Sequence, residues 1–382
     1  MKVEGFELRT VAMPLRSPFE TSFGVQTVRE LILVRLRTAD GVEGWGECVA
    51  GAAPLYSSEF NAATELVLRD FMLPALAQAS ARGGGERDRA GADALSATRV
   101  AALLEPFKGH RMAKAALEMA VLDAELRAAG LSFGTYLGAE RDTVPAGVSV
   151  GIQPSIDALL DAVAGYVEEG YLRIKLKIKP GWDVEPVRAV RERFGEELLL
   201  QVDANAAYTL AHAPLLAQLD PFDLLLIEQP LGEEDLTEHA ELARRVATPI
   251  CLDESIVSAK AAADAIALGA CSIVNIKPGR VGGYLEARRI HDVCRAHGVA
   301  VWCGGMLESG LGRAANVALA ALPGFVLPGD TSASDRYYAQ DITAPFVLED
   351  GHVAVPTGPG LGVEVVPEAL EQMTLRSEWI AC

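Results

Sequence analysis

The sequence predicts an α/β protein: a (β/α)7β TIM-like barrel joined to an α+β region that the N-terminal residues and the C-terminal tail form together. From about residue 143 onward, short apolar segments typical of strands alternate with helical segments in seven or eight successive units. This alternation favours parallel strands closed into a barrel over an open doubly wound sheet. The 382 residues also suffice for a barrel of about 250 residues and a smaller companion.

The residues before about 125 combine strand and helix patterns. Two apolar runs flank the turn signal Asp40-Gly41, which predicts a β-hairpin. Helical periodicity follows in residues 64–78 and again in residues 113–129. Between these helices, residues 80–93 are rich in glycine and charge, so they are predicted to form a solvated loop.

The predicted barrel occupies residues 126–345, between an N-terminal region of residues 1–125 and a tail of residues 346–382 that packs back on it. Its strands are predicted at residues 145–151, 173–179, 198–205, 223–230, 249–255, 272–279 and 300–306, with an eighth at 324–330 that is less regular. The tail returns to mixed turn and strand patterns, which is why it is assigned to the N-terminal region and not to the barrel.

Composition narrows the class of function. The net charge is −18, from 52 acidic and 34 basic residues, which disfavours nucleic acid or an anionic membrane as a partner and is compatible with a divalent cation. None of the six cysteines forms a CxxC pair, and the six histidines show no HExxH spacing, which counts against a zinc hydrolase. With no signal-peptide core and no run long enough to span a membrane, the predicted location is the cytoplasm.

Five of the predicted strands carry an ionisable residue near their C-terminal end, where a barrel builds its active site. These residues are Lys177, Asp203, Glu228, Asp253 and Lys277, and each follows the previous one by about one βα unit. Because helices cover the outside of a barrel, the aliphatic side chains of a strand should face outward. In Tyr171–Lys179, "YLRIKLKIK", that rule places Lys175 and Lys177 inside; it also sends Asn205 inward beside Asp203.

Three inward carboxylates on consecutive strands, Asp203, Glu228 and Asp253, suit a hard cation with oxygen ligands, most simply Mg2+. A lysine on each side, Lys177 and Lys277, supplies two candidate bases, whose pKa burial and nearby cations can lower. A metal attached to a substrate carboxylate would stabilise the enediolate formed when the α-proton leaves. Taken singly, Asp203 and Asp253 could be helix N-caps and Lys277 a surface lysine. All five lie near the C-terminal end of their strand and point to the inside of the barrel, and this joint occurrence favours an active site.

At these residues the chain resembles the enolase superfamily, in its muconate-lactonizing subgroup, whose sites use a Lys or His base with Mg2+. The resemblance rests on Lys175-Leu-Lys177, Asp203-Ala-Asn205, Glu228-Gln-Pro230, Asp253-Glu254-Ser255 and Lys277. Within the subgroup, residues 173–187, 227–231 and 302–314 are similar to o-succinylbenzoate synthases of menaquinone biosynthesis that also act as N-succinylamino acid (N-acylamino acid) racemases. The resemblance covers nearly the whole chain, and it implies that residues 1–125 and the tail form a capping domain.

The resemblance implies a role for each residue. Lys177 would be the base for dehydration while Lys277, as an ammonium, steadies the enolate; in racemisation both lysines would exchange protons, one on each face of the α-carbon. The implied substrate is a small carboxylate, and the implied assembly is a homo-oligomer. Residues 17–26 resemble mobile loops that close over substrate, although a plain surface loop explains them equally well. The candidate substrate-binding residues are Lys175, Asn205, Ser149, Gly305, Met306, Phe19 and Tyr56.

Two other interpretations remain open from the sequence. One keeps the fold but changes the reaction, to a dipeptide epimerase or a muconate-type cycloisomerase. Dipeptide epimerases usually carry Asp-x-Asp after the eighth strand to hold an α-amino group, and this chain has Asp330-Thr-Ser332 there, which disfavours that reaction. The other is a non-catalytic barrel that serves as a binding protein. The paired lysines and three acids count against it, because a scaffold would fill those positions with aliphatic side chains.

Overall fold

The structure is a computed structural model that describes residues 1–82 and 95–382. A four-stranded antiparallel sheet, in the order β13-β1-β2-β3, forms the core of the capping region. Its strands are β1 (Val3–Thr21), β2 (Gly24–Thr38), β3 (Glu43–Cys48) and β13 (Thr374–Ala381). The predicted hairpin at Asp40-Gly41 joins β2 to β3, and the tail returns to the sheet, where Gly5 on β1 pairs with Ala381 on β13.

Helices cover one face of this sheet. They are α1 (Asn61–Val67), a π-helical turn (Leu68–Met72), α2 (Leu73–Arg82), α3 (Ala97–Leu103) and the long α4 (Arg111–Ala129). α4 lies directly on β3 because Gly46 has no side chain: a Cβ there would lie 1.9 Å from the carbonyl oxygen of Ala116. The predicted loop at residues 80–93 begins inside α2, and from residue 83 onward it lies outside the described residues.

The second body is a seven-stranded parallel sheet in the order β11-β10-β9-β8-β7-β6-β5, curled into a barrel. Its strands are β5 (Gly147–Val150), β6 (Arg173–Lys177), β7 (Leu199–Asp203), β8 (Ile227–Glu228), β9 (Ile250–Leu252), β10 (Ile273–Ile276) and β11 (Ala300–Cys303). Each falls inside a predicted strand, so seven of the eight predictions are confirmed.

The eighth predicted strand, residues 324–330, is not a regular strand. It closes the gap between the two edge strands through single bridges, from Phe325 to Val301 of β11 and from Gly329 to Ala146 beside β5. Pro328 has no N–H to donate to a ladder, which explains why regular pairing fails here. Its carbonyl oxygen instead accepts hydrogen bonds from the side chain of Arg173, at 3.2 Å from Nε and 2.9 Å from Nη2.

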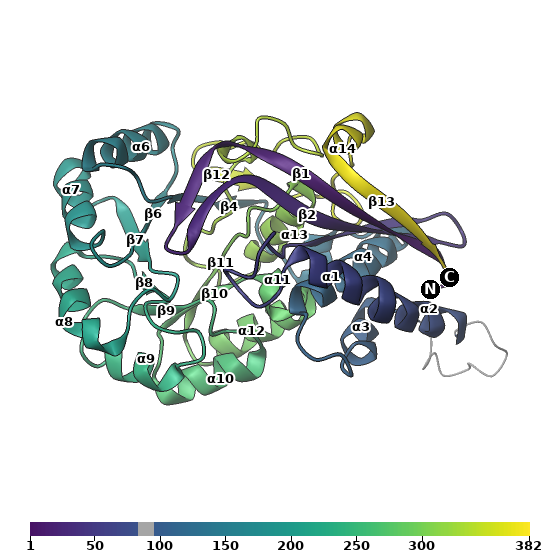
Figure 1. Cartoon of the computed structure of the whole chain (residues 1–382), viewed down its shortest axis with the longest axis horizontal. Helices are drawn as coiled ribbons and strands as arrows, with labels where there is room; N and C mark the ends of the chain where they lie inside the picture. Colours follow the sequence, from purple (N-terminus) through teal and green to yellow (C-terminus); the bar gives the residue numbers. More distant parts are fainter. Residues whose placement is uncertain (83–94) are drawn as a thin grey trace.

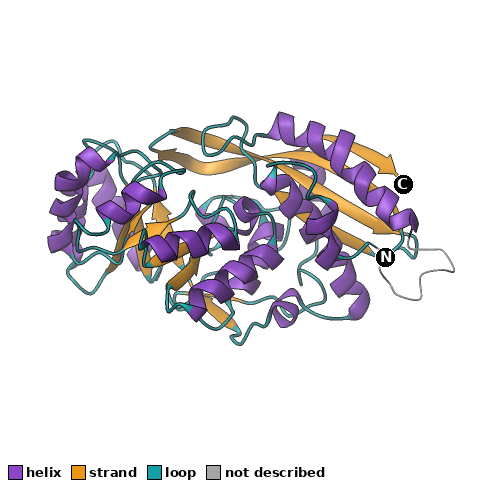
Figure 2. Cartoon of the chain, turned by 90° about the horizontal axis from the view of Figure 1, so that it is seen from below, coloured by secondary structure: helices purple, strands orange, loops and turns teal. Residues whose placement is uncertain are grey.

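Helices surround the barrel strands, as Figures 1 and 2 show. They are α6 (Ile156–Glu168), α7 (Val184–Phe194), α8 (Ala213–Leu216), α9 (Leu236–Leu242), α10 (Ala259–Leu268), α11 (Pro278–Val281), α12 (Tyr284–Ala296) and α13 (Gly310–Ala320). The outward-facing Ile174, Leu176 and Ile178 are fully buried in the hydrophobic core, as the alternation in the sequence predicts.

The remaining elements join the two bodies. Helix α5 (Phe133–Leu137) follows α4, and β4 (Thr143–Pro145) pairs with β12 (His352–Ala354). The last helix, α14 (Pro367–Met373), leads into β13, and 3-10 turns occur at Leu210–His212, Ala217–Phe222 and Ser334–Arg336. The chain ends lie together at one end of the capping sheet, while the β1–β2 hairpin extends from there to the barrel (Figure 1). None of the described helices is both long and apolar enough to cross a membrane.

Candidate active site

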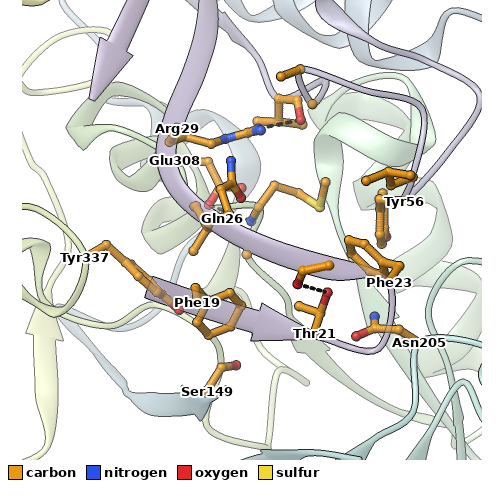
Figure 3. A pocket seen from close by; sticks show the side chains of 18 of the residues that line it. Phe19, Thr21, Phe23, Gln26, Arg29, Tyr56, Ser149, Asn205, Glu308 and Tyr337 are labelled. Carbon is orange, nitrogen blue, oxygen red and sulfur yellow. Dashed lines mark hydrogen bonds between the residues drawn. The ribbon is translucent and has the colours of Figure 1, made fainter. Parts of the chain in front are cut away.

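A cavity of about 370 Å³ lies where the β1–β2 hairpin meets the C-terminal ends of the barrel strands (Figure 3). Its lining includes the two lysines and all the substrate-binding residues predicted from the sequence: Phe19, Tyr56, Ser149, Lys175, Lys177, Asn205, Lys277, Gly305 and Met306. Asp203, Glu228 and Asp253 do not line the cavity and are fully buried at the strand ends. The structure therefore brings the predicted residues together, with the lysines at the surface of the cavity and the acids behind them.

Lys177 and Lys277 approach the acids from opposite ends of the row. Lys177, the last residue of β6, donates from Nζ to Asp203 Oδ2 at 2.6 Å and to Asn205 Oδ1 at 2.8 Å. Lys277 follows β10 and donates from Nζ to Asp253 Oδ2 at 2.7 Å and to the Tyr56 hydroxyl at 3.3 Å. Between them lie β7, β8 and β9. A substrate carbon held in the cavity above the acids would thus have one lysine on either side.

Lys175 is held in a different way. Its Nζ lies 2.6 Å from Asp330 Oδ2, 3.2 Å from Glu228 Oε2 and 4.8 Å from the centre of the Trp302 ring. Burial alone would lower the pKa of Lys175, but Asp330 and the other acids raise it above its usual value. Lys175 is therefore a fixed ammonium group, suited to binding negative charge and unsuited to taking up a proton.

The pKa of Lys277 departs from the expectation that burial lowers it. Burial does lower it, but Tyr56 and the acids Glu228, Glu254 and Asp203 outweigh that effect and raise the pKa above its ordinary value. A divalent cation bound to the same acids would oppose this rise, since it would neutralise the charges that cause it.

The acids are fixed by the loops that follow their strands. Asn205 and Gln229 have φ values of +43° and +36°, a left-handed backbone that side chains other than glycine rarely adopt and that occurs often at functional sites. The Gln229 Oε1 atom accepts hydrogen bonds from the amides of Asp253 and Ser255, at 3.0 and 3.2 Å. The turns after β7 and β8 thus end these strands sharply, and the Gln229 side chain holds the loop of Asp253 in place.

The described residues contain no group of three His, Cys, Asp or Glu side chains already placed to hold a metal ion. Instead, cations pair with the candidate ligands: Lys177 with Asp203, Lys175 with Glu228, and both Lys277 and Arg280 with Asp253. The donor set still fits a hard cation, because Asp203 and Glu228 are register partners on neighbouring strands and all donors are carboxylate oxygens.

A further carboxylate, Glu254, supports this fit. Its Oε2 atom is buried and has no hydrogen-bond partner among the described residues, while Oε1 accepts from Asn205 Nδ2 at 3.0 Å. Burial is the main cause that raises the pKa of Glu254 to about 7, and the nearby Asp203 is the second. The same two causes raise the pKa of Glu228. Carboxylates crowded in this way gain from an added positive charge.

Residues 17–26, predicted as a loop, form the end of the β1–β2 hairpin, with the turn at Ser22-Phe23. The hairpin end touches the barrel at several points: the carbonyl oxygen of Glu20 accepts from the amide of Ile152 at 3.0 Å, and its carboxylate lies 3.1 Å from Lys179 Nζ. Phe19 meets the ring of Tyr337 edge-on, with centroids 5.9 Å apart. The hairpin thus forms the outer wall of the cavity (Figure 3).

Several lining residues escaped the sequence analysis. Asp330 was considered only as a mismatch to another enzyme's motif, yet it ends the last barrel segment as the other acids end theirs, so the strand-end rule could have identified it. Further lining residues come from both bodies, among them Arg29, Glu59, Met112, Glu308 and Arg313. Glu308 and Arg313 lie within residues 302–314, which carry part of the family resemblance, but the pattern there does not show that they face the cavity. For Arg29, Glu59 and Met112, spacing along the chain carries no signal for contacts between the two bodies.

Comparisons with known proteins agree with this geometry. Residues 5–138 match the family model of the mandelate racemase / muconate lactonizing enzyme N-terminal domain, and residues 158–369 match that of the enolase C-terminal domain-like family. The chain is 68% identical over 380 residues to an N-succinylamino acid racemase from Amycolatopsis, with 100% of both chains covered. It is 46% identical over 375 residues to an o-succinylbenzoate synthase from Geobacillus kaustophilus, covering 98% of this chain and 96% of the relative. A crystal structure of an enolase-superfamily member from Listeria innocua superposes with a TM-score of 0.92 at 39% identity, covering 100% of this chain and 99% of the other.

Proposed function

This chain belongs to the enolase superfamily, in the mandelate racemase and muconate lactonizing enzyme family, and on that premise we propose that it removes the proton α to a carboxylate of a small substrate. The specific activity proposed is that of an N-succinylamino acid racemase, an o-succinylbenzoate synthase, or both, as in the relatives that resemble it over their full length. One observation carries the proposal: Lys177 and Lys277 reach a single cavity from opposite ends of a row of buried carboxylates.

In the proposed racemisation, the amine of one lysine takes the α-proton and the ammonium of the other returns a proton to the opposite face of the carbon. In the proposed dehydration, Lys177 is the base and Lys277 stays an ammonium near the developing negative charge. Lys175 differs from both lysines in its partner: Asp330, 2.6 Å from its Nζ, is not one of the three acids predicted to bind metal, so a bound cation would leave this contact in place and Lys175 would remain an ammonium group. Its place is to bind the substrate carboxylate, together with Asn205 and the hydroxyl of Ser149.

Members of this family typically use a divalent metal ion, and we assign Mg2+ to Asp203, Glu228 and Asp253. Bound there, the ion would supply positive charge at the substrate carboxylate and so lower the cost of the charge that develops there. Around it, Gly305, Met306, Phe19 and Tyr56 would enclose the substrate and exclude water. We assign residues 1–125 and 346–382 to the capping domain and 126–345 to the barrel, which the pairing of β13 with β1 supports.

The ion pairs of Asp330 disfavour the alternative of a dipeptide epimerase. An acid that holds an α-amino group must offer its oxygens to the substrate, but Asp330 Oδ1 lies 2.9 Å from Arg173 Nη2 and Oδ2 lies 2.6 Å from Lys175 Nζ. Both oxygens are thus engaged by buried cations. A muconate-type cycloisomerase shares the lysines and acids, so only its substrate distinguishes it.

An activity panel tests the proposal. The purified protein with Mg2+ is given N-succinyl amino acids of both configurations, the precursor of o-succinylbenzoate, dipeptides and muconate, and products are followed by polarimetry and ultraviolet absorbance. Turnover of the N-succinyl amino acids or of the o-succinylbenzoate precursor is the expected result. Activity confined to dipeptides or muconate, or turnover of none of these compounds, would overturn the assignment.

A further inference from the structure

The cavity continues beyond the lysines toward the capping domain, where two arginines form part of its wall. Arg29 comes from β2 and Arg313 from α13; both line the cavity, and each side chain is only 3% exposed. Figure 3 places Arg29 at the end of the pocket away from Ser149 and Asn205. This end therefore lies apart from the residues assigned to the α-carboxylate.

Both arginines have hydrogen-bonding capacity that the protein leaves unused. Arg29 donates from Nη1 to the carbonyl oxygen of Ala50 at 3.1 Å and from Nη2 to that of Val49 at 2.5 Å, and Arg313 donates to the carbonyl oxygens of Ser332 and Glu308. The Nε of each arginine is buried without a hydrogen-bond partner in the described ranges, 1–82 and 95–382. A buried donor without a partner is costly.

Two glutamates, Glu59 and Glu308, line the same cavity, but neither forms a salt bridge with Arg29 or Arg313 within the described residues. The Glu308 carboxylate accepts from the amide of Met306 and from Asn316 Nδ2, both at 2.9 Å. The Glu59 carboxylate accepts from the amides of Arg111 and Met112, at 2.6 and 2.9 Å. Two buried guanidinium groups on a cavity wall, held only by backbone carbonyls, are suited to an anion that enters the cavity.

We propose that Arg29, together with Arg313, forms a second anion subsite that binds a carboxylate at the far end of the substrate's acyl group. The inference rests on the proposed function and deepens it: with the α-carboxylate at Lys175 and the α-carbon between Lys177 and Lys277, the acyl chain extends toward the capping domain. Arg29 then selects N-acyl groups that end in a carboxylate over apolar ones of the same length. Its competitor is a bracing role, in which Arg29 only fixes the backbone of residues 49–50 ahead of Tyr56.

The test compares two substrates that differ only in the terminal group: N-succinyl-phenylalanine and N-butanoyl-phenylalanine, in which a methyl replaces the carboxylate. Wild type should favour the succinyl compound in kcat/KM. Replacing Arg29→Met should lower kcat/KM for the succinyl substrate about 10- to 100-fold, the loss typical of a hydrogen bond to a charged group, and change the butanoyl value less than about threefold. Arg29→Lys should recover part of the preference because it keeps the charge.

Arg35→Met is the matched control, since Arg35 lies on the same strand, pairs with Glu7 and Glu43 and does not line the cavity; it should leave the ratio unchanged. Equal losses for both substrates in the Arg29→Met variant would show bracing and overturn the subsite, as would a wild type with no succinyl preference. Calorimetric binding of the two compounds separates this failure from that of the proposed function. An enzyme that turns over neither compound yet binds the succinyl one more tightly, through Arg29, would keep the subsite and lose the activity.

Discussion

Removing the lysines one at a time should separate the two faces of the α-carbon. With an N-succinyl amino acid in D2O, the wild-type protein should exchange the α-proton of both enantiomers. The Lys177→Ala variant should lose racemisation, while Lys277 still exchanges the α-proton of one enantiomer; the Lys277→Ala variant should show the mirror result. The reason is geometric: each Nζ reaches the cavity from one side only.

The contacts around each lysine set the expected size of the effect. After Lys277→Ala, Asp253 keeps its pairing with Arg280, and after Lys177→Ala, Asp203 keeps Lys175 at 3.4 Å. The barrel should therefore fold in both variants. Lys175, which also lines the cavity, does not replace the lost base, because its partner Asp330 lies outside the proposed metal ligands and keeps its charge when the cation binds. The loss should reach that of a missing general base, about 10²–10⁴-fold, or about 2.7–5.4 kcal/mol of activation free energy.

Proton NMR measures the exchange directly, because the α-proton signal of each enantiomer disappears at its own rate. Lys260→Ala is a suitable control, as that lysine is 81% exposed on α10 and pairs with Asp264 on the same helix. Circular dichroism of all three variants checks that they fold. The two-base mechanism is wrong if either active-site variant racemises at nearly the wild-type rate, or if both lose exchange of the same enantiomer.

Three further predictions concern the metal, the hairpin and a buried ion pair. Asp203→Asn, Glu228→Gln and Asp253→Asn should each abolish both activity and Mn2+ binding in a titration followed by electron paramagnetic resonance, without unfolding the barrel; unchanged binding in any of them would remove that residue from the site. Amides of residues 17–26 should exchange with deuterium faster without substrate than with it, because a wall that excludes water must open to admit ligand; equal rates would argue against closure. Asp330→Asn should cost about 3–5 kcal/mol of stability at neutral pH, because it leaves Lys175 and Arg173 with a neutral partner in a buried setting. Burial would raise the pKa of Asp330, but Lys175 and Arg173 lower it, so this stabilisation is present above the unfolded-state pKa of about 3.9 and is lost as pH falls below it; denaturation midpoints of wild type and variant should converge in acid, and a constant gap would refute the ion-pair explanation.

The barrel strands, and the direction of the side chains at their C-terminal ends, were predictable from the sequence for a physical reason. Alternation along a strand has a period of two, so apolar positions such as Ile174 and Leu176 determine where Lys175 and Lys177 must point. The prediction of a loop failed where turn-forming residues lie within a pair of strands. Residues 17–26 look like a loop because they contain Ser, Pro and Gly, but they form strands because the two arms of the hairpin pair with each other, as Phe19 does with Gln26.

The sequence pattern also did not predict which residues of the two bodies contact each other. Arg29 sits in an apolar strand where the sequence offers no sign that it faces the substrate cavity, and Glu308 carries no periodic signal either. The sequence predicted that burial lowers the pKa of Lys277, but neighbouring groups raise it. These neighbours are acids that only the closed barrel brings near, and Tyr56, which comes from the capping region. Local patterns thus predict which side chains point inward at the strand ends, while the residues that line the cavity from the capping region follow only from how the two bodies meet.

The pairing of β1 with β13 has a consequence for how the protein is made. Thr10 near the start of the chain is the register partner of Arg376 on β13, so during synthesis on a ribosome β1 lacks this neighbour until the whole barrel has been made. During that interval the outer edge of β1 is open, and open strand edges recruit other strands. The sheet whose β1–β2 hairpin lines the cavity is therefore completed late. A nascent chain interrupted within the barrel would leave the edge of β1 unpaired and prone to aggregation. We expect chaperones that bind the nascent chain to contact this edge of β1.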